Sequence, residues 1–502
     1  MKTPALPRRP LRLRALLSAG FGLVLALGAA ASSSADAAAG THAAARARTV
    51  APGGTWGRAE EVPGLAALSS GGDAGVTSVS CARPGNCGAG GFYTDSSIHG
   101  QGFMVNEKAG AWGQAEEVPG LGALNAGGGA EVTSVSCPAP GACAAGGAYI
   151  DSSGFQSGIQ AFVVSEKYGV WGQAEEVPGL AALNATGHAK VTSVSCARPG
   201  DCSAVGQYRD SEFALQGFVV SETNGVWGQA EAIPGLVALN TDAQAEVTSV
   251  SCGAPGDCSA GGNYQTPFSR QHGFVVSEKG GVWGQAEEVP GLAALNQRLL
   301  AGVRSVSCAG AGECAAGGFY AGKAGRVQGF VVSERNGVWG QAKPVPGLAA
   351  LNTGGLAEVT PVSCARPGDC SAGGDYAQAG PNEQGFVVGE TNGRWGRAEQ
   401  VPGLAALRTG SEAKVFSLSC AAPGDCSAGG FYETASPQVQ GFVVSETNGH
   451  WGRAVKVPGL AALNTRGDAT ISSVSCTAAG ECSAGGSYRD GSGLHGFVVG
   501  QT

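Results

Sequence analysis

The chain carries little charge, and its charge is not concentrated in one sign. Charged residues make up 14% of the sequence, and 31 basic residues against 39 acidic ones leave a formal net charge of -8 at pH 7. Proteins that bind nucleic acid or anionic membranes present a basic stripe or patch to the phosphates. The lack of such a stripe indicates that neither nucleic acid nor a membrane surface is a partner of this protein.

Sequence motifs of common catalytic centres are also absent. The 86 glycines form no G-x-x-x-x-G-K-[ST] phosphate loop, and the chain has neither an H-E-x-x-H zinc motif nor a G-x-S-x-G nucleophile elbow with triad partners. The six histidines do not recur at a fixed spacing, as the ligands of a repeated zinc site would. A glycosidase needs two carboxylates at a defined separation, and the acids that occur once in the chain offer such pairs only by chance. We therefore expect a protein that is not an enzyme and has no catalytic, cofactor-binding or metal-binding residues.

Long apolar runs are missing except near the N-terminus. There, basic residues between Lys2 and Arg14 precede an apolar run over 15–31, in the layout of a secretory signal peptide. A transmembrane anchor needs about 20 apolar residues, and this run is shorter and interrupted by glycine and serine. The sequence predicts a signal peptide at 1–37, a flexible leader rich in Ala, Arg and Gly at 38–53, and a single domain at 54–502. We expect a secreted, extracellular monomer that is not inserted in a membrane, with association to the cell wall as an open alternative.

The cysteines show that the chain is repetitive. All 16 fall into C-x5-C pairs, which leaves no odd thiol. An even count at fixed local spacing in an exported protein indicates disulfides, each worth about 2 kcal/mol because the closed loop is short. The predicted pairs are Cys81 with Cys87, Cys137 with Cys143, Cys196 with Cys202, Cys252 with Cys258, Cys308 with Cys314, Cys364 with Cys370, Cys420 with Cys426 and Cys476 with Cys482.

Eight tryptophans divide the chain into units of 56 residues, with one spacing of 59 between Trp112 and Trp171. Self-similarity at such a period is the signature of propellers and repeat arrays. Each unit holds four extended segments separated by turn signals, of which Asn-Gly before the Trp segment is the strongest hairpin signal. The 86 glycines and 24 prolines leave few windows for a helix, so the L-A-A-L-N segment, such as 180–184, is a short turn at most.

The two ends of the chain distinguish a closed ring from an open array. The last unit ends soon after Phe497 and lacks its fourth segment, the one that carries Trp, whereas residues 55–63 are a fourth segment with no first three before it. Joining these ends removes two exposed sheet edges. The predicted fold class is all-β: one eight-bladed β-propeller of four-stranded antiparallel blades, closed by the N-terminal strand joining the last blade.

Aromatic, serine and threonine residues also recur in every unit. The Trp, Phe and Tyr of each unit, such as Trp227, Phe218 and Tyr208, are expected to pack between sheets; a stacking platform for sugar rings remains an alternative for the Tyr set. The Ser and Thr of V-T-S-V-S-C are expected to complete the hydrogen bonding of the first segment near the axis.

The units differ from one another in two connections, the loop between the second and third segments and the link from one unit to the next. Antiparallel geometry places both sets on the same face of the disc, and loops on a rigid scaffold are where recognition tends to reside. Solvent-exposed drift is the competing explanation. The candidate ligand-face residues are Asp95, His99, Asp151, Phe155, Asp210, Phe213, Phe268, Arg270, Arg326, Glu383, Glu433 and Asp490.

Two resemblances support the fold. The turn Ser221-Glu222-Thr223-Asn224-Gly225-Val226-Trp227 resembles a shortened Asp-box, the S-x-D-x-G-x-x-W turn of sialidase-type propellers, although the Asp is missing and the spacing is one residue shorter. Residues 54–502 as a whole resemble secreted tandem-repeat proteins of high-GC Gram-positive bacteria with V-S-C-x5-C-x-A-x-G in each unit. These resemblances imply a propeller and export, and they carry no catalytic residue with them.

The sequence thus favours a secreted, non-catalytic binding module that recognises an extracellular glycan, cell-wall polymer or protein through the divergent face. The alternatives are a glycoside hydrolase or lyase at the axial mouth of that face and a passive extracellular structural repeat.

Overall fold

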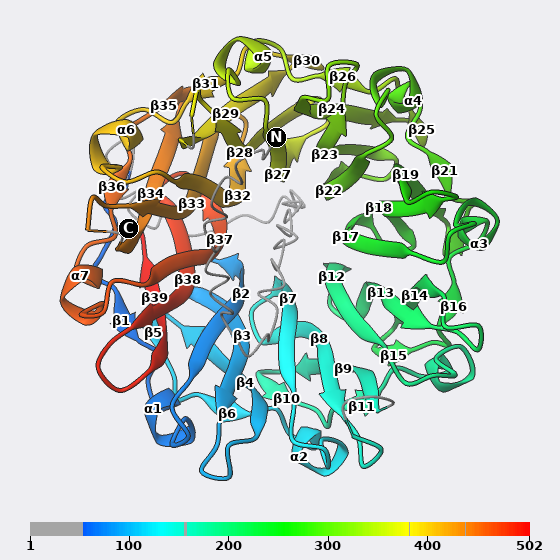
Figure 1. Ribbon diagram of the computed structural model, residues 1–502. Coiled ribbons are helices and arrows are strands. Elements are labelled where there is room, and N and C mark those ends of the chain that lie inside the picture. The colour runs from blue at the N-terminus through cyan, green and yellow to red at the C-terminus, as the bar shows by residue number, and fades with distance from the viewer. Residues whose placement is uncertain (1–53, 155–157, 381, 437) are drawn as a thin grey trace, which may run out of the picture.

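The computed structural model describes residues 54–154, 158–380, 382–436 and 438–502. Antiparallel sheets stand around a central axis like the blades of a propeller, and one-turn helices lie around the circumference (Figure 1). The predicted all-β, eight-bladed fold is confirmed. The predicted signal peptide and leader lie outside the described residues. Among the described residues, none of the helices is long and apolar enough to cross a membrane.

Each blade begins at the axis and runs outward. The inner strands are β2 (Ala74–Arg83), β7 (Glu131–Ala139), β12 (Lys190–Arg198), β17 (Ala245–Ala254), β22 (Ala301–Gly310), β27 (Ala357–Arg366), β32 (Ala413–Ala422) and β37 (Ala469–Ala478). The second strands are β3 (Asn86–Thr94), β8 (Ala142–Ile150), β13 (Asp201–Arg209), β18 (Asp257–Thr266), β23 (Glu313–Ala321), β28 (Asp369–Ala377), β33 (Asp425–Glu433) and β38 (Glu481–Arg489). The third strands are β4 (Gly100–Lys108), β9 (Ile159–Lys167), β14 (Leu215–Thr223), β19 (Arg270–Lys279), β24 (Val327–Arg335), β29 (Glu383–Thr391), β34 (Val439–Thr447) and β39 (Leu494–Gly500). We number the blades 1 to 8 in the order of these strands.

The outer strand of blades 1 to 7 is split into two short pieces that pair with the same third strand. In blades 1 to 7 these pieces are β5 (Ala111–Trp112) and β6 (Glu116–Glu117), β10 (Val170–Trp171) and β11 (Glu175–Glu176), β15 (Val226–Trp227) and β16 (Glu231–Ala232), β20 (Val282–Trp283) and β21 (Glu287–Glu288), β25 (Val338–Trp339) and β26 (Lys343–Pro344), β30 (Arg394–Trp395) and β31 (Glu399–Gln400), and β35 (His450–Trp451) and β36 (Val455–Lys456).

The leucine-rich segment after each outer strand forms a single helical turn. Its N-terminal residue is a glycine with positive φ, such as Gly64 at 79°, a conformation that glycine adopts without steric cost. The turns in the described residues are α1 (Leu65–Leu68), α2 (Leu121–Leu124), η1 (Leu180–Ala182), α3 (Leu236–Leu239), α4 (Leu292–Leu295), α5 (Leu348–Leu351), α6 (Leu404–Leu407) and α7 (Leu460–Leu463). The expected short turn is therefore present, as 3-10 helix in η1 and as α-helix elsewhere.

The ring closes as the sequence predicts. The N-terminal β1 (Glu60–Glu61) pairs antiparallel with β39, with Glu60 opposite Val498 and Glu61 opposite Phe497. Trp56 and Gln501 add an isolated bridge. The outer strand of blade 8 thus comes from the start of the domain, and no separate capping unit is needed at this junction.

The core lies between the blades. In one cluster, Val163 of blade 2 packs with Phe218 and Trp227 of blade 3. The Tyr that ends each second strand is also buried, with 1% to 7% of its surface exposed in the eight blades. Packing therefore accounts for the recurring aromatics, and the alternative of an exposed tyrosine platform for sugar rings is wrong.

Disulfides stabilise each blade, and serine hydroxyls join neighbouring blades. All 16 cysteines are described and form the eight predicted C-x5-C disulfides, with S–S distances such as 2.02 Å for Cys81–Cys87. Each joins the inner and second strands of one blade. Between blades 1 and 2, Ser78 Oγ accepts a hydrogen bond from Val135 N at 3.0 Å, and Ser80 Oγ accepts one from Cys137 N at 2.9 Å. The Ser residues near the axis therefore bond to the next blade.

Candidate functional site

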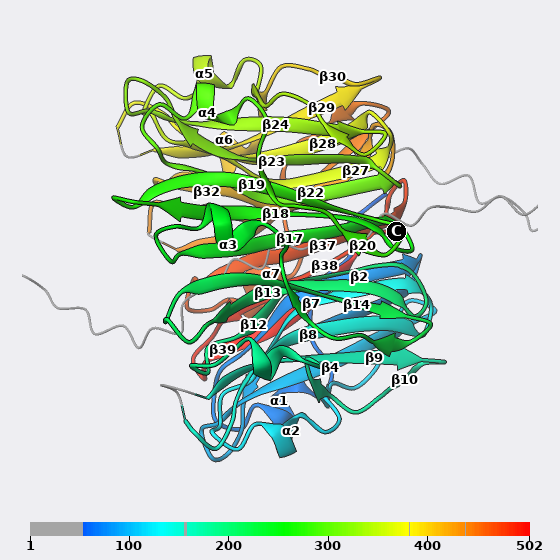
Figure 2. The ribbon, with the colours of Figure 1, turned by 90° about the vertical axis from the view of Figure 1, so that its right-hand side faces the viewer.

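The two faces of the disc are built from different connections. We call the face with the loops between second and third strands and the links between blades the loop face, and the face with the two hairpin turns of each blade the turn face. Figure 1 looks onto the loop face, and in the side view the β9–β10 turn projects on the right, at the turn face (Figure 2). On the loop face the two kinds of connection are hydrogen-bonded, as in Gly71 N to Thr94 O at 2.9 Å and Gly100 N to Gly128 O at 3.0 Å.

Four of the predicted ligand-face acids shape their own loops. Asp95, Asp151, Asp210 and Asp490 each accept a hydrogen bond from the backbone N–H two residues later, at 2.7 to 2.9 Å. This is the Asx-turn arrangement. The hydroxyl and then the backbone N–H of Ser492 lower the pKa of Asp490 to about 2. These carboxylates hold the loops in shape rather than extending into solvent.

Arg326, Glu383 and Glu433 also make contacts within the loop face. The Arg326 guanidinium donates to the carbonyl of Asn352, and the Glu433 carboxylate accepts from Ser411 N at 2.8 Å. Glu383 forms an ion pair with Lys414 Nζ of the next blade at 2.5 Å. Arg326 and Glu433 thus hold neighbouring connections together, and Glu383 joins strands of neighbouring blades.

Apolar side chains at the loop tips are the exposed feature of this face. Phe213 is 69% exposed and Phe268 is 86% exposed, and Ile98, which the sequence pattern did not single out, is 79% exposed. His99 has 54% of its side chain exposed, and the Arg270 guanidinium lies 5.4 Å from the centre of the Phe268 ring. Phe155 lies outside the described residues.

These apolar residues occupy an unfavourable backbone conformation. Ile98, Phe213 and Phe268 have φ of 64°, 62° and 71°, in the left-handed region where a bulky L-residue is an outlier. At the same position of the turn, blades 2 and 5 have Gly154 and Gly325, with φ of 79° and 75°. We treat the positions in blades 1, 2, 3 and 5 as equivalent because they share one hydrogen bond. In each, the residue with positive φ donates its N–H to the carbonyl three residues before, at 2.8 to 3.1 Å. Blades 1 and 3 thus place a large apolar group where glycine fits with less strain.

Charged residues near the axis form a second variable set, which the sequence pattern did not identify. Arg304 Nε lies 3.2 Å from Glu358 Oε2 of the next blade, and Glu358 is opposite Asp375 in the sheet. Burial raises the pKa of Asp375 to about 7, and Lys414 Nζ lies 4.0 Å from it. Two of these residues, Glu358 and Lys414, precede the V-T-S-V-S-C segment of their units. Comparing this position across the units reveals them, because it is Gly75, Glu131, Lys190, Glu246, Gly302, Glu358, Lys414 and Thr470.

One cluster on the loop face has the residue types of a hydrolytic triad. Ser492 Oγ lies 2.9 Å from His495 Nε2, and His495 Nδ1 lies 3.8 Å from Glu61 Oε1. However, blades 1 and 2 have Gln101 and Gln160 at the position that His495 occupies in blade 8. Each donates through Nε2 to the Asp of its own loop, at 3.1 and 3.0 Å. His495 Nε2 lies 3.0 Å from Asp490 in the same way. A ring nitrogen that donates to Asp490 has no lone pair to accept the Ser492 proton, so the cluster favours loop shaping over nucleophilic catalysis.

Within the described ranges 54–154, 158–380, 382–436 and 438–502, no group of three or more His, Cys, Asp and Glu side chains is placed to hold a metal ion.

The fold is an eight-bladed propeller, and its eight disulfides suggest an oxidising, extracellular environment. No protein-family model and no curated protein matches the chain. Among solved structures it is distantly similar to a protein of unknown function from Dyadobacter fermentans DSM 18053 (11% identity, TM-score 0.34, 62% of this chain and 94% of that chain). It is also similar to Trypanosoma rangeli sialidase in complex with sialic acid (12% identity, TM-score 0.32, 60% of this chain and 52% of that chain). A third similar structure is Pyrococcus horikoshii acylaminoacyl peptidase (10% identity, TM-score 0.43, 86% of this chain and 60% of that chain). Likenesses at this level concern the propeller fold alone.

Proposed function

We propose that this protein is a secreted, non-catalytic binding propeller that recognises an extracellular glycan, cell-wall polymer or protein through its loop face. The observation that carries the proposal is the set of exposed apolar residues, Ile98, Phe213 and Phe268, held at loop tips in the left-handed backbone region. Backbone strain of this kind persists at binding sites, where the side chain it presents is part of the function.

The chemistry of these tips suits a ligand with both apolar and polar groups. Exposed aromatic rings supply large contact area with few rotatable bonds, and Arg270 beside Phe268 adds a charged donor. Because the tips sit on three different blades, the ligand contacts are spread across the face. An extended polymer or a protein surface can contact several of them at once.

The alternative of a glycoside hydrolase or lyase has weaker support. Asp375 has a raised pKa, which is a property of catalytic acids, but only 3% of its surface is exposed. The second alternative, a passive structural repeat, predicts that no ligand is retained.

Retention on immobilised ligands tests the proposal. The mature protein is passed over purified cell walls, a polysaccharide panel and extracellular proteins, beside a variant with Ile98→Gly, Phe213→Gly and Phe268→Gly. The matched control carries Val226→Gly, Val282→Gly and Val338→Gly, which removes apolar residues that are 70% to 71% exposed at turns on the opposite face. We expect saturable retention that the loop-face variant loses and the control keeps.

Equal retention by the two variants, or none by the unmodified protein, would overturn the proposal. Release of cleaved fragments from a retained polymer would support the enzymatic alternative instead.

A further inference from the structure

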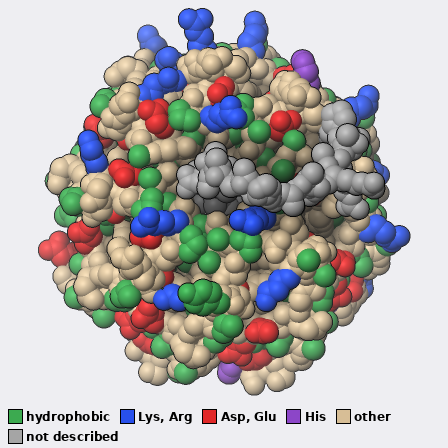
Figure 3. Space-filling view, turned by 180° about the vertical axis from the view of Figure 1, so that it is seen from behind, with side chains coloured by type: hydrophobic (Ala, Val, Ile, Leu, Met, Phe, Trp, Pro, Cys, Tyr) green, Lys and Arg blue, Asp and Glu red, His purple; other side chains and the backbone are tan. Residues whose placement is uncertain are grey.

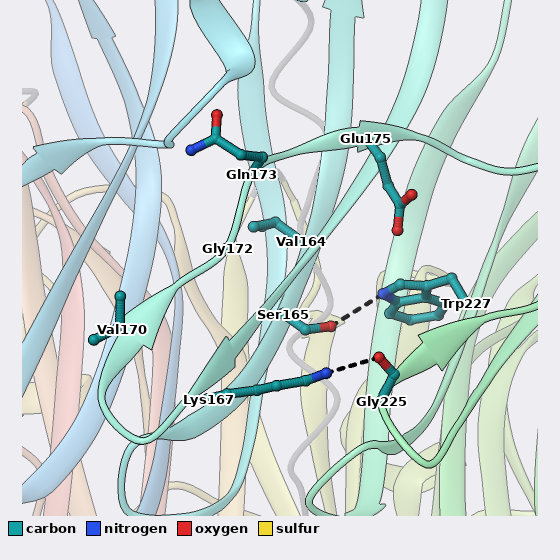
Figure 4. Close-up of a pocket in the computed structure, with 9 residues that line it drawn as sticks. All are labelled: Val164, Ser165, Lys167, Val170, Gly172, Gln173, Glu175, Gly225 and Trp227. Atoms are coloured by element: carbon teal, nitrogen blue, oxygen red, sulfur yellow. Dashed lines mark hydrogen bonds between the residues drawn. The ribbon is translucent and has the colours of Figure 1, made fainter.

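A repeated contact joins neighbouring blades near the turn face. Between blades 2 and 3, Ser165 Oγ donates to Glu222 Oε1 at 2.7 Å and accepts from Trp227 Nε1 at 3.0 Å. Figure 4 shows Ser165 and Trp227 side by side in a surface cavity between these blades. Glu222 and Trp227 are opposite each other in one hairpin, so two residues of this hairpin bind the Ser165 hydroxyl of the preceding blade. We call the arrangement the blade clamp.

The serine of the blade clamp is not present at every junction between blades. Blades 4 and 5 repeat it, with Ser277 Oγ 2.7 Å from Glu334 Oε1 and 3.0 Å from Trp339 Nε1. The residue at this position in blades 1 to 8 is Asn106, Ser165, Ser221, Ser277, Ser333, Gly389, Ser445 and Gly500. At Gly389 an added Cβ would have no atom within 4 Å. The hydroxyl is therefore replaced by open space between blades 6 and 7.

This space deepens the cavity between blades 6 and 7. The cavity between blades 2 and 3, of about 220 Å³, is lined by Ser165 and Trp227. The one between blades 6 and 7, of about 280 Å³, passes Gly389 and reaches Ser371, Glu446 and Trp451. Its volume is near the lower bound of ordinary ligand pockets, which restricts it to small ligands.

The side chains at the entrance of this cavity are also smaller. Between blades 2 and 3, Lys167 Nζ reaches across to the carbonyl of Gly225 at 2.9 Å (Figure 4). Blade 6 has the shorter, uncharged Thr391 at the position of Lys167. An added Cβ at Gly449, the counterpart of Gly225, has no atom within 4 Å. Figure 3 shows the turn face, where basic and acidic side chains are scattered among hydrophobic ones.

Glu446 gives the cavity its chemical character. It is 8% exposed, and its Oε2 accepts one long hydrogen bond from Ser371 Oγ at 3.4 Å. Among the described residues, Oε1 has no hydrogen-bond partner. This oxygen is not among the enclosed, unpaired oxygens, so it is open to the cavity, where a ligand that brings N–H groups and positive charge can donate a charge-assisted hydrogen bond to it.

The other charged residues of the lining favour the same kind of ligand. Asp369, Glu390 and Glu399 add three carboxylates, of which Glu390 already accepts a hydrogen bond from Ser333 Oγ at 3.1 Å. The lining cation Arg397 lies against the preceding blade, with Nε 3.4 Å from where a Cβ on Gly347 would be. Trp451 supplies an aromatic wall, and an aromatic ring attracts a cation.

We propose that the cavity between blades 6 and 7 binds a small amine, no larger than a monosaccharide, through its primary ammonium group. The ammonium donates hydrogen bonds to Glu446 Oε1 and Ser371 Oγ, and the carrier lies against Trp451. A metal ion is not the ligand we assign, because the described residues hold no cluster that fits one. Blade 8 also has glycine at this position, Gly500, but the free oxygen of Glu107 at that junction is enclosed by protein.

Indole N–H signals in a ¹⁵N-correlated NMR spectrum test the proposal on the full secreted chain, with the Trp451 signal assigned by Trp451→Phe. Ethylammonium and glucosamine are titrated beside ethanol, N-acetylglucosamine and Ca²⁺. We expect saturable shifts of the Trp451 signal with the two amines only. Gly389→Ser, which restores the residue found in five other blades, should weaken binding at least tenfold while the fold is kept, and Glu446→Gln should do the same.

A variant at another junction between blades provides a control measurement. Ser277→Gly removes the serine hydroxyl between blades 4 and 5 and should leave the Trp451 titration unchanged, so it controls for loss of a blade clamp elsewhere. Equal shifts with ethanol or Ca²⁺, or binding that survives both Gly389→Ser and Glu446→Gln, would overturn the proposal.

Discussion

At the scale of single residues, some loop tips keep an apolar side chain exposed in a backbone conformation that lowers the stability of the fold. The left-handed backbone region costs an L-residue about 1 to 2 kcal/mol, and Phe213 adopts it while 69% of its surface remains exposed. Glycine at the same position of blades 2 and 5 avoids that cost. The chain therefore keeps an apolar group in solvent at a site where folding alone favours its removal.

We predict that Phe213→Gly stabilises the protein by about 1 kcal/mol, because relief of strain exceeds the extra entropy of glycine in the unfolded chain. Chemical denaturation measures the change. The same variant should bind the loop-face ligand more weakly. A loss of stability would show that Phe213 packs against its surroundings and is not strained in the way we describe.

Glu446 makes stability depend on pH. Burial raises the pKa of its carboxyl to about 7, above the value of about 4.3 expected in the unfolded chain. The folded protein therefore holds the proton more tightly, and stability falls as the pH rises from about 4.3 to 7. Above pH 7 the full penalty of ionising the buried carboxyl applies.

We predict that Glu446→Gln stabilises the protein by about 1 to 2 kcal/mol at pH 8, allowing for solvent screening in the cavity, and leaves it nearly unchanged at pH 4. Gln501, at the corresponding position of blade 8, shows that an amide fits, since its Nε2 donates to Ser445 Oγ at 3.0 Å. Thermal melts at both pH values measure the effect, and exposed Glu116→Gln is the control. Equal gains at the two pH values would contradict the assignment.

The sequence predicted the disulfides of this protein more fully than the contacts of its loop residues. Cys81 and Cys87 are close in the chain, so their pairing needs only local geometry. An Asp that caps its own loop and an Asp that meets a ligand have the same appearance in sequence, so the role of Asp95 was not foreseen. The significance of Ile98 depends on its φ angle, which the sequence shows only through the glycine that replaces it in other blades.

At the scale of elements, the inner strands show why the junction between blades 6 and 7 differs from the rest. Ser305 Oγ of blade 5 accepts from Val362 N at 3.1 Å, but the next blade has Pro361 at the position of Ser305. Proline offers no hydroxyl to Leu418 of blade 7 and no N–H to its own sheet. This junction therefore lacks both the inner serine and, at Gly389, the serine of the blade clamp.

We predict that Pro361→Ser stabilises the protein by about 1 kcal/mol. Two hydrogen bonds of about 1 kcal/mol each are gained, and the loss of the proline constraint on the unfolded chain offsets about 1 kcal/mol. Denaturant titration measures the gain, and hydrogen exchange at Leu418 N–H should slow. Unchanged exchange would mean that the new hydroxyl does not reach blade 7.

Secondary structure was predicted well where one pattern serves a whole segment. The four extended segments of each unit identified the strands, and Asn-Gly identified a hairpin turn. The break of each outer strand into two pieces, such as β15 and β16, was not predicted, because both pieces belong to one extended run and the break depends on pairing with β14.

At the scale of the whole molecule, ring closure is a contact between the two ends of the domain. We predict that deleting residues 54–62 exposes the edge of β39, which then pairs with other copies, because an unpaired edge strand is a template for association. Size-exclusion chromatography with light scattering should show oligomers and melting should begin earlier. A peptide of residues 54–63 added in trans should restore the monomer, and a monomer of unchanged melting temperature would contradict the role of β1.

The joining of β1 to β39 also limits the number of units that the ring can hold. Near-identical units in tandem are readily duplicated or lost when genes recombine, and an open array accepts a shorter or longer copy at little cost. Here a change in unit number keeps both β1 and β39, which close the ring. It alters the angle between neighbouring blades, however, and the serine hydrogen bonds between inner strands form only at one separation of the blades. The differences between units accordingly lie in the loops, within a fixed number of units.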